Sequence, residues 1–307
     1  MADYISFNVG QGIQAQSGTW YNNVQHLGTG GNSVVFLVHA TSGPHIGVLF
    51  ALKVFFKVSA PERRERFLEE ISFLQRCDHP SVMRVYDSGV FHINYPQPQD
   101  HPFVIADYLP LRLYDVMRSG TATIPERVSY ARQLLSALHY LSSLDPQVIH
   151  RDIKPQNIFV KGGSCVLGDF GLMKLLDGEN ELDREIFKES IEPGMPFFYR
   201  TPDLVAYARG ESGITVKSDV FQLGLVLAEL FTGRNPARRP KDVLDPVDLE
   251  LLGKIPGSLS GAIATLINRM LRMDTGKRPS VDELLKPWEG IFESAVEKSH
   301  ELDGRVL

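Results

Sequence analysis

Runs of β-branched and aromatic residues alternate with turn residues through the first third of the chain. These runs span residues 22–27, 33–40, 47–56, 81–91 and 102–109. Segments rich in glycine, proline and polar residues separate them, as is typical of strands joined by turns. The pattern predicts a mostly antiparallel sheet in this part of the chain.

Helical spacing occurs once within the same region and then dominates the second half. Phe67, Ile71 and Leu74 recur at intervals of three and four residues in a charged stretch after Pro61, which predicts one amphipathic helix. Beyond Leu111, long helical stretches follow at residues 125–144, 218–233 and 259–273. We therefore predict an α+β fold with a small antiparallel β lobe, which carries one main helix, and a larger, mainly α-helical lobe.

The composition argues against several classes of function. The 307 residues are 43% hydrophobic, which suffices for one large core or two moderate ones. The formal net charge of −5 leaves no basic excess for nucleic-acid phosphates, so nucleic acid is not an expected partner. Cys77 and Cys165 are the only cysteines, too few for a disulfide framework or a clustered zinc site.

Neither a signal peptide nor a membrane span is predicted. The N-terminal residues lack the basic segment and apolar run of a signal peptide. The most apolar stretch, residues 220–231, is interrupted by Gln222 and Glu229 and is too short to cross a bilayer. We expect a cytoplasmic protein without a membrane span.

Three glycines, Gly28, Gly30 and Gly31, lie between two predicted strands in the segment LGTGGNSVVFLV. Because glycine has no Cβ, backbone amides at such a turn can approach a chain of phosphate groups closely. An ordinary flexible hairpin turn is the alternative interpretation. The glycines alone therefore indicate phosphate binding only weakly.

A lysine within an apolar strand needs a partner. Lys53 lies in the run FALKVF, where its ammonium group would emerge on a largely buried face of the sheet. Glu70 on the following helix is the preferred partner because it lies one turn before Leu74, and Glu69 is its rival. The alternative is a lysine that extends to water and a surface glutamate.

The most specific passage is a run of eight residues, followed by a second motif. It consists of His150, Arg151, Asp152, Ile153, Lys154, Pro155, Gln156 and Asn157, and then of Asp169, Phe170 and Gly171. With these motifs the chain, from about residue 23 to 288, resembles the eukaryotic-type serine/threonine protein kinases. The resemblance implies their bilobal fold and the transfer of the γ-phosphoryl group of ATP to serine or threonine hydroxyls of protein substrates.

The resemblance also implies roles for single residues. Asp152 would accept the proton of the substrate hydroxyl, and Lys154 would neutralise charge on the γ-phosphate. Asn157 and Asp169 would bind Mg²⁺, with Mn²⁺ as a possible substitute, because such hard cations prefer oxygen ligands. An ion pair with Glu70 would aim the Lys53 ammonium at the α- and β-phosphates.

The same resemblance outlines a nucleotide pocket. Val35 and Ala51 from the sheet and Phe159 from the second lobe would enclose the adenine, and main-chain groups of Asp107 and Leu109 would bond its edge. With these residues, the expected ATP-binding positions are Leu27, Gly28, Gly30, Gly31, Val35, Ala51, Lys53, Asp107, Leu109 and Phe159. Without the resemblance, each apolar member would be interpreted as ordinary core.

Further matches imply a complete fold. Asp219 would bond the backbone of the catalytic loop, and Arg278 would pair with Asp203. The predicted division of the chain is an N-terminal extension, a first lobe, a second lobe and a C-terminal tail, at residues 1–20, 21–109, 110–290 and 291–307.

Regulation and activity leave alternatives open. Glu192 aligns where family members usually carry a phosphorylated residue, so we hypothesise that it supplies a permanent carboxylate to Arg151. Ser190 is a candidate for autophosphorylation. A catalytically silent, kinase-like scaffold and a kinase-fold enzyme that acts on a small molecule are the competing interpretations.

Overall fold

The described part of the chain forms two compact units, Met1–Pro110 and Leu111–Leu307. The computed structural model describes residues 5–30, 33–56, 61–93, 98–170, 174–176, 184–185, 187–188 and 198–303. The backbone alone is described at residues 61–63, 65–66, 69–70, 93 and 299–303. None of the described helices is long and apolar enough to cross a membrane.

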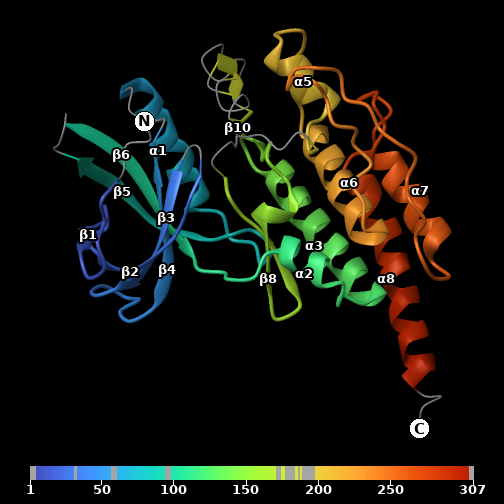
Figure 1. The fold of residues 1–307 in the computed structure, drawn as a ribbon, viewed down its shortest axis with the longest axis horizontal. Coiled ribbons are helices and arrows are strands. Elements are labelled where there is room, and N and C mark those ends of the chain that lie inside the picture. The colour runs from blue at the N-terminus through green and yellow to red at the C-terminus, as the bar shows by residue number, and fades with distance from the viewer. Residues whose placement is uncertain are drawn as a thin grey trace. The chain divides into compact units, whose positions relative to one another are not determined.

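An antiparallel sheet and one helix make up the first unit (Figure 1). The six strands lie in the order β1-β2-β3-β4-β6-β5. The elements are β1 (Gly12–Gln14), β2 (Trp20–Thr29), β3 (Ser33–Ala40), β4 (Leu49–Phe55), α1 (Pro61–Leu74), β5 (Val85–Ile93) and β6 (Gln99–Asp107). The predicted antiparallel sheet with one helix is therefore confirmed.

Alternation along the strands separates the two faces of this sheet. Val34, Phe36 and Val38 on β3 are buried on one face, together with Leu52 on β4. Residues between them point to the other face because successive Cβ atoms alternate along a strand. On β3 this second face carries Val35, which pairs with Lys53 of β4.

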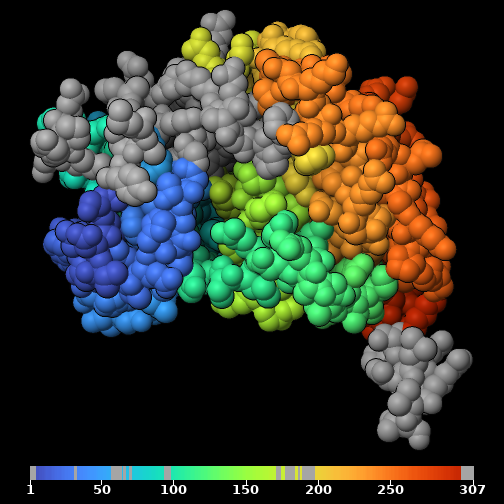
Figure 2. All heavy atoms as spheres, in the orientation of Figure 1, coloured from blue at the N-terminus to red at the C-terminus, as the bar shows by residue number. Residues whose placement is uncertain are grey.

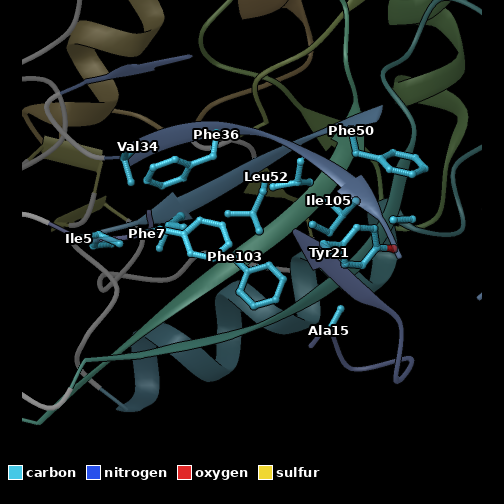
Figure 3. Packing of buried hydrophobic residues seen from close by; sticks show 13 residues of the cluster. Ile5, Phe7, Ala15, Tyr21, Val34, Phe36, Phe50, Leu52, Phe103 and Ile105 are labelled. Carbon is cyan, nitrogen blue, oxygen red and sulfur yellow. The ribbon is translucent and has the colours of Figure 1, made fainter. Parts of the chain in front are cut away.

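The N-terminal residues cover the first of these faces. Ile5, Phe7 and Ala15 are buried in the same apolar cluster as the strand residues (Figure 3). The Phe7 ring lies edge-on to Phe36 and Phe91, with centroids 5.3 and 5.5 Å away. The darkest blue atoms in Figure 2 show this end of the chain on the surface of the first unit. Residues 5–15 therefore complete the core of the first unit.

Helices make up most of the second unit. Its elements are α2 (Leu113–Ser119), α3 (Ile124–Ser143), β7 (Val148–Ile149), the 3₁₀ helix η1 (Pro155–Asn157), β8 (Ile158–Lys161), β9 (Ser164–Leu167), β10 (Lys174–Leu175), α5 (Pro202–Ala208), α6 (Lys217–Thr232), α7 (Ser260–Met270) and α8 (Asp282–Asp303). The prediction of a mainly helical second half is confirmed.

Two helices show how the sequence determines local structure. At the start of α3, Thr123 and Glu126 form a capping box that satisfies backbone N–H groups left open at a helix N-terminus. Helix α6 is buried nearly all round, as expected for an apolar helix inside a lobe. It ends at Gly233, whose φ of 76° is left-handed and therefore favours glycine.

Replacing Phe7 with alanine tests the cover over the first face of the sheet. We expect the free energy of unfolding of the first unit to fall by about 3–5 kcal/mol, because a buried ring leaves a cavity. Trp20 is the single tryptophan of this unit, so urea unfolding in a Trp288→Phe background would report on it. Val9→Ala is the matched control, because Val9 is 73% exposed in the same segment. Equal losses in the two variants would contradict the assigned packing.

Candidate functional site

Three predicted catalytic-loop residues meet in the segment after β7, which ends with η1. The Lys154 Nζ donates to Asp152 Oδ2 at 2.9 Å. The Asn157 amide donates to the same carboxylate oxygen at 2.8 Å and to the main-chain oxygen of Asp152 at 2.9 Å. Because its nitrogen faces Asp152, the amide oxygen of Asn157 is turned away from that carboxylate. The structure thus brings Asp152, Lys154 and Asn157 into one cluster.

Burial changes the acidity of Asp152, which is 7% exposed. Removal from water raises the pKa of Asp152 to about 6, and the nearby Asp169 carboxylate acts in the same direction. The Lys154 ammonium opposes this rise in pKa. A carboxylate with a pKa closer to neutrality accepts a proton more readily than an ordinary one.

A tight hairpin brings Asp169 close to Asn157. Gly162 and Gly163 join β8 to β9 with φ values of 55° and 83°, and both are left-handed, as a two-residue hairpin turn of type I′ requires. The resulting register places Gly168 opposite Asn157, and the Gly168 N–H donates to the Asn157 carbonyl at 2.9 Å. Asp169 is the next residue. The pair of glycines between two apolar runs is a sequence signal that predicts this hairpin.

Two residues of the site adopt left-handed backbone conformations without being glycine. Arg151 has φ of 64° and Asp169 has φ of 61°. For residues other than glycine, such a conformation raises the free energy by about 1–3 kcal/mol, and it persists where the surrounding structure holds it in place. Each lies in, or next to, the cluster of Asp152 and Asn157.

Helix α6 provides much of that surrounding support. Both carboxylate oxygens of the 2% exposed Asp219 accept N–H groups of the loop, from His150 at 2.8 Å and from Arg151 at 3.0 Å. Burial raises the pKa of Asp219 to about 7, and the two N–H donors oppose the rise. The predicted contact between Asp219 and the loop backbone is therefore confirmed.

Gln222, one turn later on α6, is a supporting residue that the sequence analysis missed. Its side-chain oxygen accepts the Ile153 N–H at 2.9 Å, and its nitrogen donates to the carbonyls of Arg151 at 3.0 Å and Tyr199 at 2.9 Å. A polar residue three positions after Asp219 in an otherwise apolar helix was the available signal. Its fully buried amide needs partners, and the loop backbone supplies them.

His150 and Phe170 pack against one another. Their ring centroids lie 4.7 Å apart. His150 Nε2 lies 3.0 Å from the Gly168 carbonyl, which can only accept, so this nitrogen carries the proton. The other ring nitrogen, Nδ1, is 3.3 Å from the Asp152 N–H and accepts it. The imidazole therefore links the loop to the segment before Asp169.

The first unit gathers several predicted nucleotide-binding residues on one face of its sheet. Gly28 pairs with Val35, Val35 pairs with Lys53, and Leu37 pairs with Ala51. Opposite residues of antiparallel strands point the same way, so Gly28, Val35, Ala51 and Lys53 share the second face. The Lys53 ammonium lies 5.1 Å from the centroid of the Phe55 ring.

The other predicted pocket residues lie on or near several different strands. Leu27 is exposed near the end of β2, and Gly30 donates its N–H to the Ser33 carbonyl at 2.8 Å in the following turn. Asp107 ends β6, and its side chain accepts from Tyr86 at 3.1 Å. Leu109 is buried beyond β6, whereas Phe159 lies on β8 and is partly exposed.

Several predictions lie outside the described part of the chain. They concern Gly31, Gly171, Ser190, Glu192 and the side chains of Glu69 and Glu70. The predicted partner of Lys53 and the predicted carboxylate for Arg151 therefore stay predictions. In contrast, the predicted pair of Arg278 and Asp203 is confirmed, with a nitrogen–oxygen distance of 3.0 Å and both side chains buried.

Comparison with known proteins identifies the family. The model of the protein kinase domain matches residues 21–288, which is most of the chain. The chain belongs to the protein kinase family. The resemblance to eukaryotic-type serine/threonine kinases and the bilobal α+β kinase fold are thereby confirmed.

Curated relatives of this kinase chain are named as serine/threonine kinases. A probable serine/threonine-protein kinase, nek3, of Dictyostelium discoideum is 30% identical over 87% of the chain and 23% of the relative. The serine/threonine-protein kinase WNK of Caenorhabditis elegans is 30% identical over 72% of the chain and 12% of the relative. A mouse relative, named inactive serine/threonine-protein kinase PLK5, is 30% identical over 88% of the chain and 42% of the relative. The matched part of the chain thus spans less than half of each relative.

The donor set of this kinase site fits a hard divalent cation. The Asp169 carboxylate and the Asn157 amide oxygen are the kind of ligand that magnesium prefers, and magnesium usually takes few protein ligands besides phosphates and water. Across the described residues, no group of three or more His, Cys, Asp or Glu side chains could hold a metal.

Replacing Asp219 with asparagine tests the support of the kinase catalytic loop. One acceptor oxygen becomes an NH₂ group, so the N–H of His150 or Arg151 loses its partner. We expect the free energy of unfolding to fall by about 1–3 kcal/mol, measured by urea unfolding with Trp288 fluorescence. Asp115→Asn, an exposed aspartate in the first turn of α2, should change it by no more than about 1 kcal/mol. A loss at Asp219 as small as this would contradict the assigned role.

Proposed function

We propose that this chain transfers the γ-phosphoryl group of Mg-ATP to serine and threonine hydroxyls of protein substrates. The observation that carries the proposal is the buried cluster of Asp152, Lys154 and Asn157 on a loop held by Asp219. Such a cluster suits phosphoryl transfer because this reaction depends mainly on positioning and on stabilising charge.

Asp152 and Lys154 carry the reacting groups in this proposal. The Asp152 carboxylate orients the substrate hydroxyl and accepts its proton as the new phosphorus–oxygen bond forms. The bond to the β-phosphate oxygen breaks, and ADP leaves with that electron pair. The Lys154 ammonium, 2.9 Å from the Asp152 carboxylate, neutralises negative charge on the transferring group. Lysine at this position favours serine and threonine over tyrosine as acceptors, by resemblance to the family.

Binding of the nucleotide falls to other residues. Asn157 and Asp169 would hold magnesium, which would neutralise charge on the phosphates. Lys53, with Glu70 as its partner, binds the α- and β-phosphates, and Gly28, Gly30 and Gly31 bring backbone amides to them. Leu27, Val35, Ala51 and Phe159 contact the adenine, and the main chain of Asp107 and Leu109 bonds its edge.

A catalytically silent scaffold is the second candidate function. The observation that favours it is the mouse relative whose name describes it as inactive. Retention of Lys53, Asp152, Asn157 and Asp169 in this chain favours the enzyme. The two functions differ in one measurable respect, because a scaffold can bind nucleotide but does not transfer phosphate.

Replacing Asp152 with asparagine tests the reaction. With γ-labelled ATP, Mg²⁺ and a generic basic protein, we expect the wild-type chain to label serine and threonine, as read by phosphoamino-acid analysis. In the variant, kcat should fall by about 10²–10⁴-fold, because asparagine cannot accept the proton. Asp115→Asn is the matched control and should keep the wild-type rate. No transfer by wild-type protein that binds ATP would favour the scaffold, and label on tyrosine alone would contradict the acceptor assignment.

Replacing Asp169 with asparagine tests the metal site separately from the chemistry. At an ATP concentration of about 100 times Kd, bound ligand should stabilise the wild-type chain by about 2.7 kcal/mol, seen as a rise in Tm. We expect chelation of Mg²⁺ to remove most of this rise. In Asp169→Asn the rise should be small with or without Mg²⁺. An unchanged, Mg²⁺-dependent rise in the variant would exclude Asp169 as a metal ligand.

A further inference from the structure

Two aromatic rings and three cations form a cluster beside the catalytic loop. The Phe187 and Tyr207 rings lie 5.8 Å apart, and both side chains are buried in one apolar group. The Arg151 guanidinium lies 4.7 Å from the centroid of Phe187. Lys174 and Arg184 lie 5.7 and 5.3 Å from the centroid of Tyr207. No motif in the sequence analysis pointed to either ring.

Arg151 links this cluster to the reacting carboxylate. It directly precedes Asp152 and has the left-handed φ of 64°, which a residue with a side chain adopts only when its surroundings hold it there. Its backbone is held from α6, because its N–H donates to Asp219 and its carbonyl accepts from Gln222. Its side chain, in a residue only 3% exposed, is covered by the Phe187 ring.

The ring matters because it covers a charged group rather than an apolar one. A buried guanidinium loses hydration and needs partners, and the negative face of an aromatic ring is one of them. An aliphatic side chain in place of Phe187 could fill similar space but has no such face. The Arg151 side chain would then lose one of its partners, and the left-handed backbone before Asp152 would lose one of its supports.

We propose that Phe187 is a positioning residue for Asp152, which it holds in place through the stacked Arg151. This inference rests on the proposed phosphoryl transfer and extends it to Phe187 and Arg151, the residues that position Asp152. The contact needs no phosphate on the chain. It follows that any change that withdraws the Phe187 ring from Arg151 should lower turnover.

Phe187→Leu tests the inference against a matched control. Phe187 and Phe231 are each 1% exposed in the second unit, but Phe231 stacks on Trp288, at a centroid distance of 6.0 Å. Both leucine variants should lose stability in urea unfolding. We expect Phe187→Leu alone to lower kcat about tenfold, with KM for ATP unchanged. The free energy of a desolvated cation–π contact corresponds to a change in rate of about this factor. An unchanged kcat in Phe187→Leu would overturn the inference.

A double variant separates positioning from general loss of structure. In an Arg151→Ala background, Phe187→Leu should lower kcat less than about twofold further, since residues that act through one contact are not additive. If the fold-losses in kcat of the two single variants multiplied in the double variant, Phe187 would not act through Arg151. This result would also overturn the inference.

Hydrogen exchange provides a readout that does not depend on phosphoryl transfer. The N–H groups of His150, Arg151 and Ile153 are bonded to α6, so their exchange reports opening of the loop. We expect exchange in residues 148–157 to be about tenfold faster in Phe187→Leu and unchanged in Phe231→Leu. Unchanged exchange in Phe187→Leu would overturn the inference. An absence of transfer by the wild-type chain would overturn the proposed function instead.

Discussion

The carboxylate of Asp219 is the interaction on which the catalytic loop depends. It is buried within an apolar helix, where a charge is tolerated only if its lone pairs are satisfied. The N–H groups of His150 and Arg151 satisfy it. If the loop left α6, the buried Asp219 carboxylate would lose these two hydrogen-bond donors, and this constraint determines where Asp152 lies.

Three further supports act on the same few residues. Gln222 bonds the backbone on both sides of Asp152, at Ile153 and Arg151. The hairpin of β8 and β9 brings Asp169 close to Asn157. The Phe187 ring covers the Arg151 side chain. The supports come from α6, from the β8–β9 hairpin and from Phe187, so the geometry around Asp152 is determined before any substrate arrives. Preorganised groups of this kind need little rearrangement during a reaction.

Much of the fold could be predicted from local pattern. Alternation predicted the antiparallel sheet, and periodicity predicted α1 and the long helices of the second unit. The strand β1 and the packing of Ile5 and Phe7 were not predicted, because a short segment with isolated apolar residues carries no periodic signal. Both faces of the sheet carry apolar residues, and the sequence did not indicate that residues 5–15 cover one of them.

The sequence by itself identified the candidate site residues, because the motifs that carry the family resemblance, from His150 to Asn157 and from Asp169 onward, are short stretches of chain. Short spacing restricts where such residues can lie relative to one another. Only the tertiary structure decided what holds them. Gln222 and Phe187 contact Arg151 across long intervals of chain. The pattern of hydrophobic residues in a sequence predicts that a side chain is buried, but it does not predict which residue that side chain contacts. Those partners depend on how helices and loops pack, which no local spacing encodes.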